Sequence, residues 1–145
     1  MGEPSVFPQI SIPLMELTYS VMPVSMGNPH CILFCPHPEE IALDVLGPAL
    51  ERHPVFPDRT NVEFVAVEGD QLRLRVWERG SGETLACGTG ACAALAAAHF
   101  LGLCPPEVTA LLPGGSLVLS LDTASGHIRM TGPAVTVFEG EWPGG

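Results

Sequence analysis

The chain has 145 residues, of which 46% are apolar and only 15% are charged, so it is large and apolar enough to fold around a buried core. Its formal net charge is −10 and its six cations are all arginine, which excludes the basic face that nucleic-acid binding needs. No apolar run approaches the length of about 20 residues that crosses a bilayer, and the first four residues lack the pattern of a signal peptide. We therefore expect a cytoplasmic protein with neither nucleic acid nor a membrane as a partner.

The first half of the chain predicts strands and one helix. The expected elements are a proline-rich extended segment over residues 1–14, strands at 16–24 and 31–34, a turn at 25–29 and a helix over 38–51. The helix is indicated by Pro38 at its start and by two acidic residues in its first turn. Pro48 is expected to end or kink it, because proline cannot donate a helical hydrogen bond.

The second half predicts more strands around one apolar helix. The expected elements are strands at 61–67 and 72–77 joined by a turn, a loop at 79–82, a helix over 89–101, and strands at 108–112, 116–121, 127–131 and 134–138. The helix 89–101 carries little polarity on any side, and a helix that is apolar all round is normally buried. We therefore expect one α+β domain over residues 1–145, in which a curved mixed β-sheet or barrel wraps around a central apolar helix.

A cysteine, Cys87, stands immediately before this helix and is followed by Gly-Thr-Gly. The first turn of a helix exposes backbone N–H groups that carry partial positive charge. These groups predict a lowered pKa for the thiol, and the N–H groups of Gly88 and Thr89 are suited to bind a carboxylate. The plainer interpretation is a packed, inert cysteine beside a glycine turn, since cysteine is among the most buried residue types.

The chain has five cysteines, an odd number that argues against a disulfide framework and for buried thiols with one reactive thiol among them. We assign the other four, Cys31, Cys35, Cys92 and Cys104, to packing. The spacing of Cys31 and Cys35, with His30 and His37 nearby in the sequence, leaves a zinc site as an alternative. Because Cys31 lies in an apolar run, our expectation is that the chain binds no metal.

Three segments together resemble the diaminopimelate epimerase family. The run from Glu78 to Cys92, with Glu-Arg-Gly-Ser-Gly-Glu-Thr before Ala-Cys-Gly-Thr-Gly, is similar to the family signature. The segments 26–30 (Met-Gly-Asn-Pro-His) and 56–62 (Phe-Pro-Asp-Arg-Thr-Asn-Val) match in the family's order, and residues 1–4 look like its inter-lobe segment. The resemblance implies that residues 1–145 correspond to the C-terminal lobe of a two-lobed protein whose N-terminal lobe is absent here.

The resemblance also implies a function: interconversion of LL- and meso-diaminopimelate by two cysteines, without pyridoxal or any other cofactor, in lysine and cell-wall biosynthesis. Each lobe of the family carries one catalytic cysteine followed by glycine, and this chain has that pair only at Cys87–Gly88. We therefore expect the isolated chain to be inactive without the first lobe, its partner being that lobe or a second copy in a homodimer. The alternatives are a catalytically inactive truncated lobe and another isomerase of the same fold, proline-racemase-like or phenazine-biosynthesis-like.

The acid–base end of the site is carried over by the same resemblance. It implies that Cys87 is one acid–base residue and that Gly88 and Thr89 donate N–H groups to the α-carboxylate. It further implies that His30 and Glu78 modulate the thiol pKa values. Without the family, His30 is equally well explained as a hydrogen-bonded core histidine.

The distal end of diaminopimelate is a second amino-acid group, and the resemblance implies four residues that bind it. Arg79 would pair with the distal carboxylate, for which a guanidinium group is well shaped, and Glu78 would face the distal ammonium. Asn28 and Asn61 would add hydrogen bonds. Each has a simpler explanation: Asn28 as a turn residue, Asn61 as the start of a strand, and Glu78 with Arg79 as a solvated ion pair.

Overall fold

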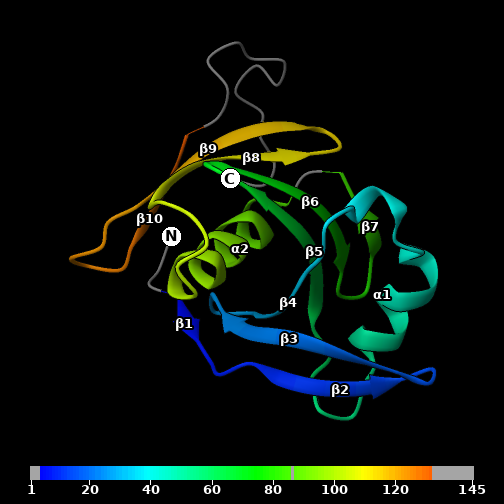
Figure 1. Ribbon diagram of the computed structural model, residues 1–145. Helices are drawn as coiled ribbons and strands as arrows, with labels where there is room; N and C mark the ends of the chain where they lie inside the picture. Colours follow the sequence, from blue (N-terminus) through cyan, green and yellow to red (C-terminus); the bar gives the residue numbers. More distant parts are fainter. Residues whose placement is uncertain (1–3, 86, 132–145) are drawn as a thin grey trace.

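The structure, a computed structural model, describes residues 4–85 and 87–131 of the chain (Figure 1). Its strands are β1 (Ser5–Val6), β2 (Ile10–Leu14), β3 (Leu17–Ser25), β4 (Pro29–Phe34), β5 (Asn61–Glu68), β6 (Gln71–Glu78), β7 (Gly82–Thr84), β8 (Glu107–Leu112), β9 (Gly115–Leu121) and β10 (Ile128–Thr131). Its helices are the 3₁₀ turn η1 (Pro38–Glu40), α1 (Leu43–Glu51) and α2 (Gly88–Phe100).

One curved sheet encloses α2. The strands follow the order β1-β3-β4-β5-β6-β8-β9-β10, with β2 beside β3 and β7 beside β6. The pairs β4–β5 and β6–β8 are parallel and the remaining pairs are antiparallel, so the sheet is mixed. In Figure 1 the sheet bends around α2, with β3 and β4 on one side of the helix and β8 and β9 on the other. The predicted architecture, a curved mixed sheet around a central apolar helix, is confirmed.

The helix α2 forms the core because it presents small apolar side chains in every direction. The residues from Gly90 to Ala98 are all buried, and Leu95 has no exposed surface. On β6, Leu72, Leu74 and Val76 point toward α2, whereas the residues between them lie on the opposite face, as the alternation predicts. Alanine occupies six of the nine positions from Gly90 to Ala98, and these small side chains let the strands approach closely, so this part of the helix is enclosed on nearly all sides.

A second apolar cluster lies on the outer face of β4, β5 and β6, where α1 packs. Leu43 and Leu50 of α1 are buried against Phe64 of β5, which has no exposed surface. The predicted continuous helix over 38–51 is wrong in detail, because η1 and α1 are separate elements. The expectation that Pro48 ends the helix is also wrong: α1 continues to Glu51, since proline removes one N–H donor but its carbonyl still accepts from Arg52. The alternative, a kink at Pro48, stays a prediction.

The N-terminal segment is more regular than its proline content predicts. It contains β1 and β2, and β2 is joined to β3 by the two-residue turn Met15–Glu16. Both turn residues have positive φ, 51° and 70°, which matches the hand of a tight hairpin turn. The predicted loop at 79–82 leads into the short strand β7, and the strand expected at 134–138 lies outside the described residues. Within the described ranges, none of the helices has the length and apolar character needed to cross a membrane.

Candidate functional site

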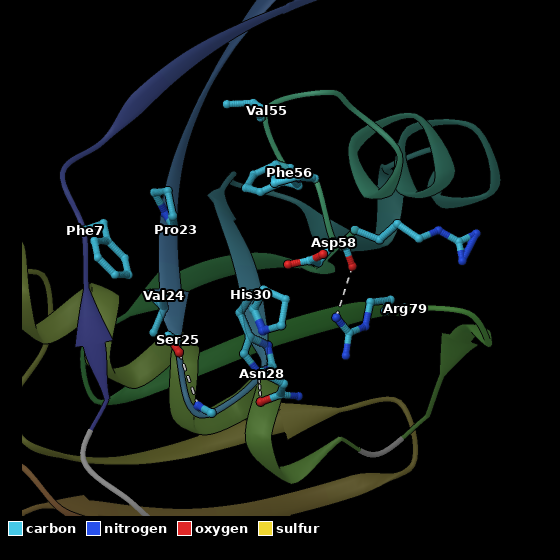
Figure 2. A pocket seen from close by; sticks show the side chains of 14 residues that line it. Phe7, Pro23, Val24, Ser25, Asn28, His30, Val55, Phe56, Asp58 and Arg79 are labelled. Atoms are coloured by element: carbon cyan, nitrogen blue, oxygen red, sulfur yellow. Dashed lines mark hydrogen bonds between the residues drawn. The ribbon is translucent and has the colours of Figure 1, made fainter.

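A pocket of about 450 Å³ lies beside the β3–β4 turn (Figure 2). Its walls come from Phe7 after β1, from the end of β3 with the turn to β4 and the start of β4, from the segment 55–59 after α1, and from Arg79. Of the residues predicted to form the site, Asn28, His30 and Arg79 line it. Asn28 also belongs to the turn, since its carbonyl accepts from the Met26 N–H at 3.0 Å, so the turn role and the pocket position coincide.

Asn61 joins two segments around this pocket through its buried amide. In the parallel pair β4–β5, Asn61 lies opposite His30. Its Nδ2 donates to the Pro29 carbonyl at 3.1 Å, and its Oδ1 accepts from the Arg79 backbone N–H at 2.7 Å. Asn61 therefore does more than start a strand: it fixes the turn that carries Arg79.

Glu78 ends β6 and Arg79 follows it, and the two side chains contact different partners. The Arg79 guanidinium is exposed at the pocket rim and donates to the Asp58 carbonyl at 3.2 Å, the dashed contact visible in Figure 2. The Glu78 carboxylate accepts from the Thr84 hydroxyl at 3.4 Å. The side chains of Glu78 and Arg79 are therefore not paired with each other in the described structure, and each can contact a ligand independently.

Glu51, at the end of α1, supports this turn and was missed by sequence reasoning. Its carboxylate accepts from Trp77 Nε1 and from the Gly80 N–H, both at 2.9 Å, and lies 3.6 Å from Arg59. Burial alone would raise the pKa of Glu51, but the hydrogen bonds from Trp77 and Gly80, together with the positive charge of Arg59, hold that pKa below its ordinary value. Glu51 thus remains ionised and anchors the backbone next to Arg79.

Cys87 is the N-cap residue of α2. Its sulfur accepts from the Gly90 N–H at 3.4 Å and lies 3.7 Å from the Thr89 hydroxyl. Among the described residues, no acceptor meets the N–H groups of Gly88 and Thr89, as is usual for the first turn of a helix. The thiol therefore lies beside donors suited to a carboxylate. Cys87, Gly88 and Thr89 are not among the residues that line the pocket of Figure 2, and neither are Asn61 and Glu78.

The thiol pKa contradicts the sequence prediction. We expected the helix N-terminus to lower the pKa of Cys87, but in the structure that pKa is raised above the ordinary value of 9.0. Burial is the largest cause, and the negative charges of Glu63 and Glu78 add to it. The hydrogen bonds from Thr89 and Gly90 oppose the increase without cancelling it. In this chain alone, Cys87 is therefore held as the neutral thiol.

Alkylation of Cys87 is expected to be slow at neutral pH, because only the thiolate reacts and the raised pKa keeps its fraction small. The rate should rise about tenfold for each pH unit through neutrality and level off only above pH 9.0. Peptide mass spectrometry after timed iodoacetamide pulses measures the rate at this position, with free cysteine as the reference. A plateau below pH 9 would contradict the structure.

His30 is held between two oxygen atoms. Its Nδ1 lies 2.7 Å from Glu63 Oε2, and its Nε2 lies 3.2 Å from Asn28 Oδ1. Both His30 and Glu63 are buried, and burial raises the pKa of Glu63 although the charge of His30 opposes this. Glu63 was not predicted. The available signal was a lone carboxylate within an otherwise apolar strand, where an unpaired charge is costly.

The zinc alternative receives no support from the geometry. Cys31 is fully buried in the apolar core, where burial raises its pKa far above the range in which a thiolate forms. The described part of the chain holds no group of three histidine, cysteine or acidic side chains placed to bind a metal ion.

Comparison with known proteins agrees with this geometry. The diaminopimelate epimerase family profile matches residues 22–137. Diaminopimelate epimerase of Thermosynechococcus vestitus is 51% identical over 142 residues, which cover 92% of this chain and 50% of that protein. The enzyme so named in Desulfovibrio desulfuricans is 51% identical over 125 residues, covering 86% of this chain and 44% of that protein. The chain therefore belongs to the diaminopimelate epimerase family, and it spans about half the length of the curated relatives it matches.

Solved structures support the same fold. A probable proline racemase from Agrobacterium radiobacter with bound carbonate has a TM-score of 0.61 at 16% identity, covering 97% of this chain and 53% of that chain. A phenazine biosynthesis protein of the PhzF family from Bacillus anthracis has a TM-score of 0.52 at 19% identity, covering 88% of this chain and 39% of that chain. At these identities the similarity concerns the fold alone.

Proposed function

We propose that this chain is one lobe of a diaminopimelate epimerase and supplies one of the two cysteines that invert the substrate α-carbon. The observation that carries the proposal is Cys87, placed as the N-cap of a buried helix beside the N–H groups of Gly88 and Thr89, which meet no acceptor in the part of the chain that the structure describes. The family membership of the chain gives the substrate class, diaminopimelate. The corresponding pathway is lysine and cell-wall biosynthesis. The cytoplasmic location stays a prediction.

The proposed reaction moves a proton at each face of the α-carbon. The α-carboxylate binds the N–H groups of Gly88 and Thr89, which stabilise the negative charge that develops when the α-proton leaves. Cys87 exchanges a proton on one face, and a cysteine of the other lobe serves the opposite face. Since Cys87 is neutral in the isolated chain, it begins as the proton donor in this scheme. His30 and Glu78 modulate the thiol, and no cofactor takes part.

The proposed distal subsite uses Arg79, Asn28, Asn61 and Glu78. Arg79 supports this assignment because its guanidinium is exposed at the pocket rim and, among residues 4–85 and 87–131, bonds only to the Asp58 carbonyl, which leaves donors for a carboxylate. Asn28 lines the same pocket. The Asn61 amide bonds to protein backbone through both its nitrogen and its oxygen. Its contribution to binding therefore includes fixing the position of Arg79.

The chain alone is expected not to epimerise diaminopimelate, because a single thiol reaches only one face of the α-carbon. The measurement is α-hydrogen exchange and inversion in deuterated water, with purified reduced chain, with and without the first half of the Thermosynechococcus relative. Turnover of roughly 1 per second or more is expected only in the mixture. The same rate for the chain alone, in direct proportion to chain concentration, would refute the two-lobe proposal.

Two other results have defined meanings. Exchange that increases with the square of chain concentration would indicate a homodimer that pairs two copies of Cys87 across a two-fold axis. No exchange in a mixture whose halves demonstrably bind each other would favour an inactive lobe.

A further inference from the structure

The buried carboxylate of Glu63 has no role in the proposed reaction, yet it lies between the proposed thiol and the proposed modulating histidine. Glu63 is on β5, and its side chain has no exposed surface. Its Oε2 lies 2.7 Å from His30 Nδ1, whereas its Oε1 has no hydrogen-bond partner among the described residues. A buried carboxylate with one unsatisfied oxygen costs free energy, so its presence calls for a functional explanation.

The same carboxylate reaches the first turn of α2. A Cβ atom added to Gly90 would meet Glu63 Oε2 at 2.8 Å and the Cys87 sulfur at 3.2 Å. Both distances start from one point, so the oxygen and the sulfur are at most about 6 Å apart, within the range at which a charge shifts the pKa of a neighbour. Gly90 is the second glycine of Gly-Thr-Gly. Because it has no side chain, the Glu63 carboxylate can lie close to the first turn of α2.

We propose that Glu63 is a positioning residue for Cys87: it orients the His30 ring toward Asn28 and places a buried negative charge behind the first turn of α2, so that Cys87 keeps its proton while the site is empty. This inference rests on the proposed function, in which Cys87 is an acid–base residue. With Glu63 in place, Cys87 stays protonated and can donate a proton. Its thiolate forms only when bound substrate or the other lobe changes the surroundings of the sulfur.

The charged and titratable groups around this position are few. Glu63 has His30 and Cys31 of β4 nearby, Glu78 of β6, and Cys87 at the start of α2. Two of them act on Cys87 with the same sign, because the charges of Glu63 and Glu78 both raise its pKa, and Glu63 is the stronger of the two. Neutralising Glu63 therefore removes the larger electrostatic barrier to ionisation of Cys87.

The test is the pH profile of Cys87 alkylation by iodoacetamide in wild-type chain and in Glu63→Gln, which keeps the size of the side chain and removes its charge. The midpoint is expected to fall by about one pH unit, which makes alkylation about tenfold faster at any pH below both midpoints. Glu68→Gln, the same change at the exposed end of β5, should leave the profile unchanged. An unchanged midpoint in Glu63→Gln, or a uniform increase in rate at all pH values, would overturn the proposal, because looser packing alone raises access without moving the midpoint.

A second variant covers the case in which Glu63→Gln does not fold, which circular dichroism detects. Glu63→Asp retains the charge but withdraws the carboxylate from α2 by one methylene, so the Cys87 midpoint should fall below the wild-type value, by less than about one pH unit. A midpoint equal to or above that of the wild type would overturn the proposal. Alkylation requires no turnover, so this result is independent of whether the chain epimerises diaminopimelate.

Discussion

Replacing Cys87 with alanine should lower α-proton exchange by about 10²–10⁴-fold in a preparation that contains both lobes, which is the usual contribution of a general acid or base. Alanine removes the proton donor from one face of the substrate but keeps the backbone of α2. Binding of the substrate should change little, because the N–H groups of Gly88 and Thr89 remain. The expected signature is thus a reduced kcat with a nearly constant KM, measured by deuterium incorporation.

Cys104→Ala is the matched control, since Cys104 is a half-buried cysteine in the segment after α2, away from the proposed site. It removes one thiol and should leave the rate unchanged. Equal losses in both variants would indicate that thiol oxidation or folding, and not proton transfer, limits the reaction. An unchanged rate in Cys87→Ala would remove Cys87 from the mechanism.

The substitution Gly47→Ala should destabilise the chain by about 2 kcal/mol, although alanine normally favours a helix over glycine by about 1 kcal/mol. A Cβ at this buried position of α1 would lie 2.5 Å from two atoms of the Trp77 indole ring, so the ring must move. Movement of Trp77 also breaks its hydrogen bond to Glu51. Packing strain therefore outweighs helix propensity, and thermal unfolding should show a Tm lower by roughly 5–10 °C.

Val45→Ala is the control for this prediction, because Val45 lies in the same helix with 49% of its surface exposed. It offers the gain in helix propensity without a clash and should leave Tm unchanged or slightly raised. Stabilisation by Gly47→Ala would show that α1 shifts freely away from β6, which the packing against Trp77 contradicts.

Much of the fold was predictable because the sequence pattern is strong where burial is complete. The run of alanines after Gly90 can be stable only inside a core, and the alternation over 72–77 fixed which side of β6 faces it. Proline was the weak point. Pro48 was expected to end or kink a helix that in fact continues, because packing of Leu43 and Leu50 on the sheet compensates for one missing donor.

The site was predictable only in part, because charge interactions between distant strands leave no local pattern. The segment before α2 identified Cys87, and the family resemblance pointed to the β3–β4 turn and to Arg79. Glu63 and Glu51 were missed because their partners are distant in the sequence. Glu63 is 33 residues from His30, and Glu51 is 26 residues from Trp77. The predicted sign of the Cys87 pKa shift was wrong for the same reason, since only the folded structure brings the carboxylates near the thiol.

The position of α2 in the chain has a consequence for synthesis. The helix contacts β1 and β3 to β6, which precede it, and β9 and β10, which follow it. A ribosome therefore releases the apolar helix before its enclosure is complete. Until β8 to β10 emerge, one side of an almost entirely apolar helix faces water, and incomplete chains of this kind are prone to aggregate. The domain is expected to acquire its stability late in translation, when β8 to β10 close over the helix.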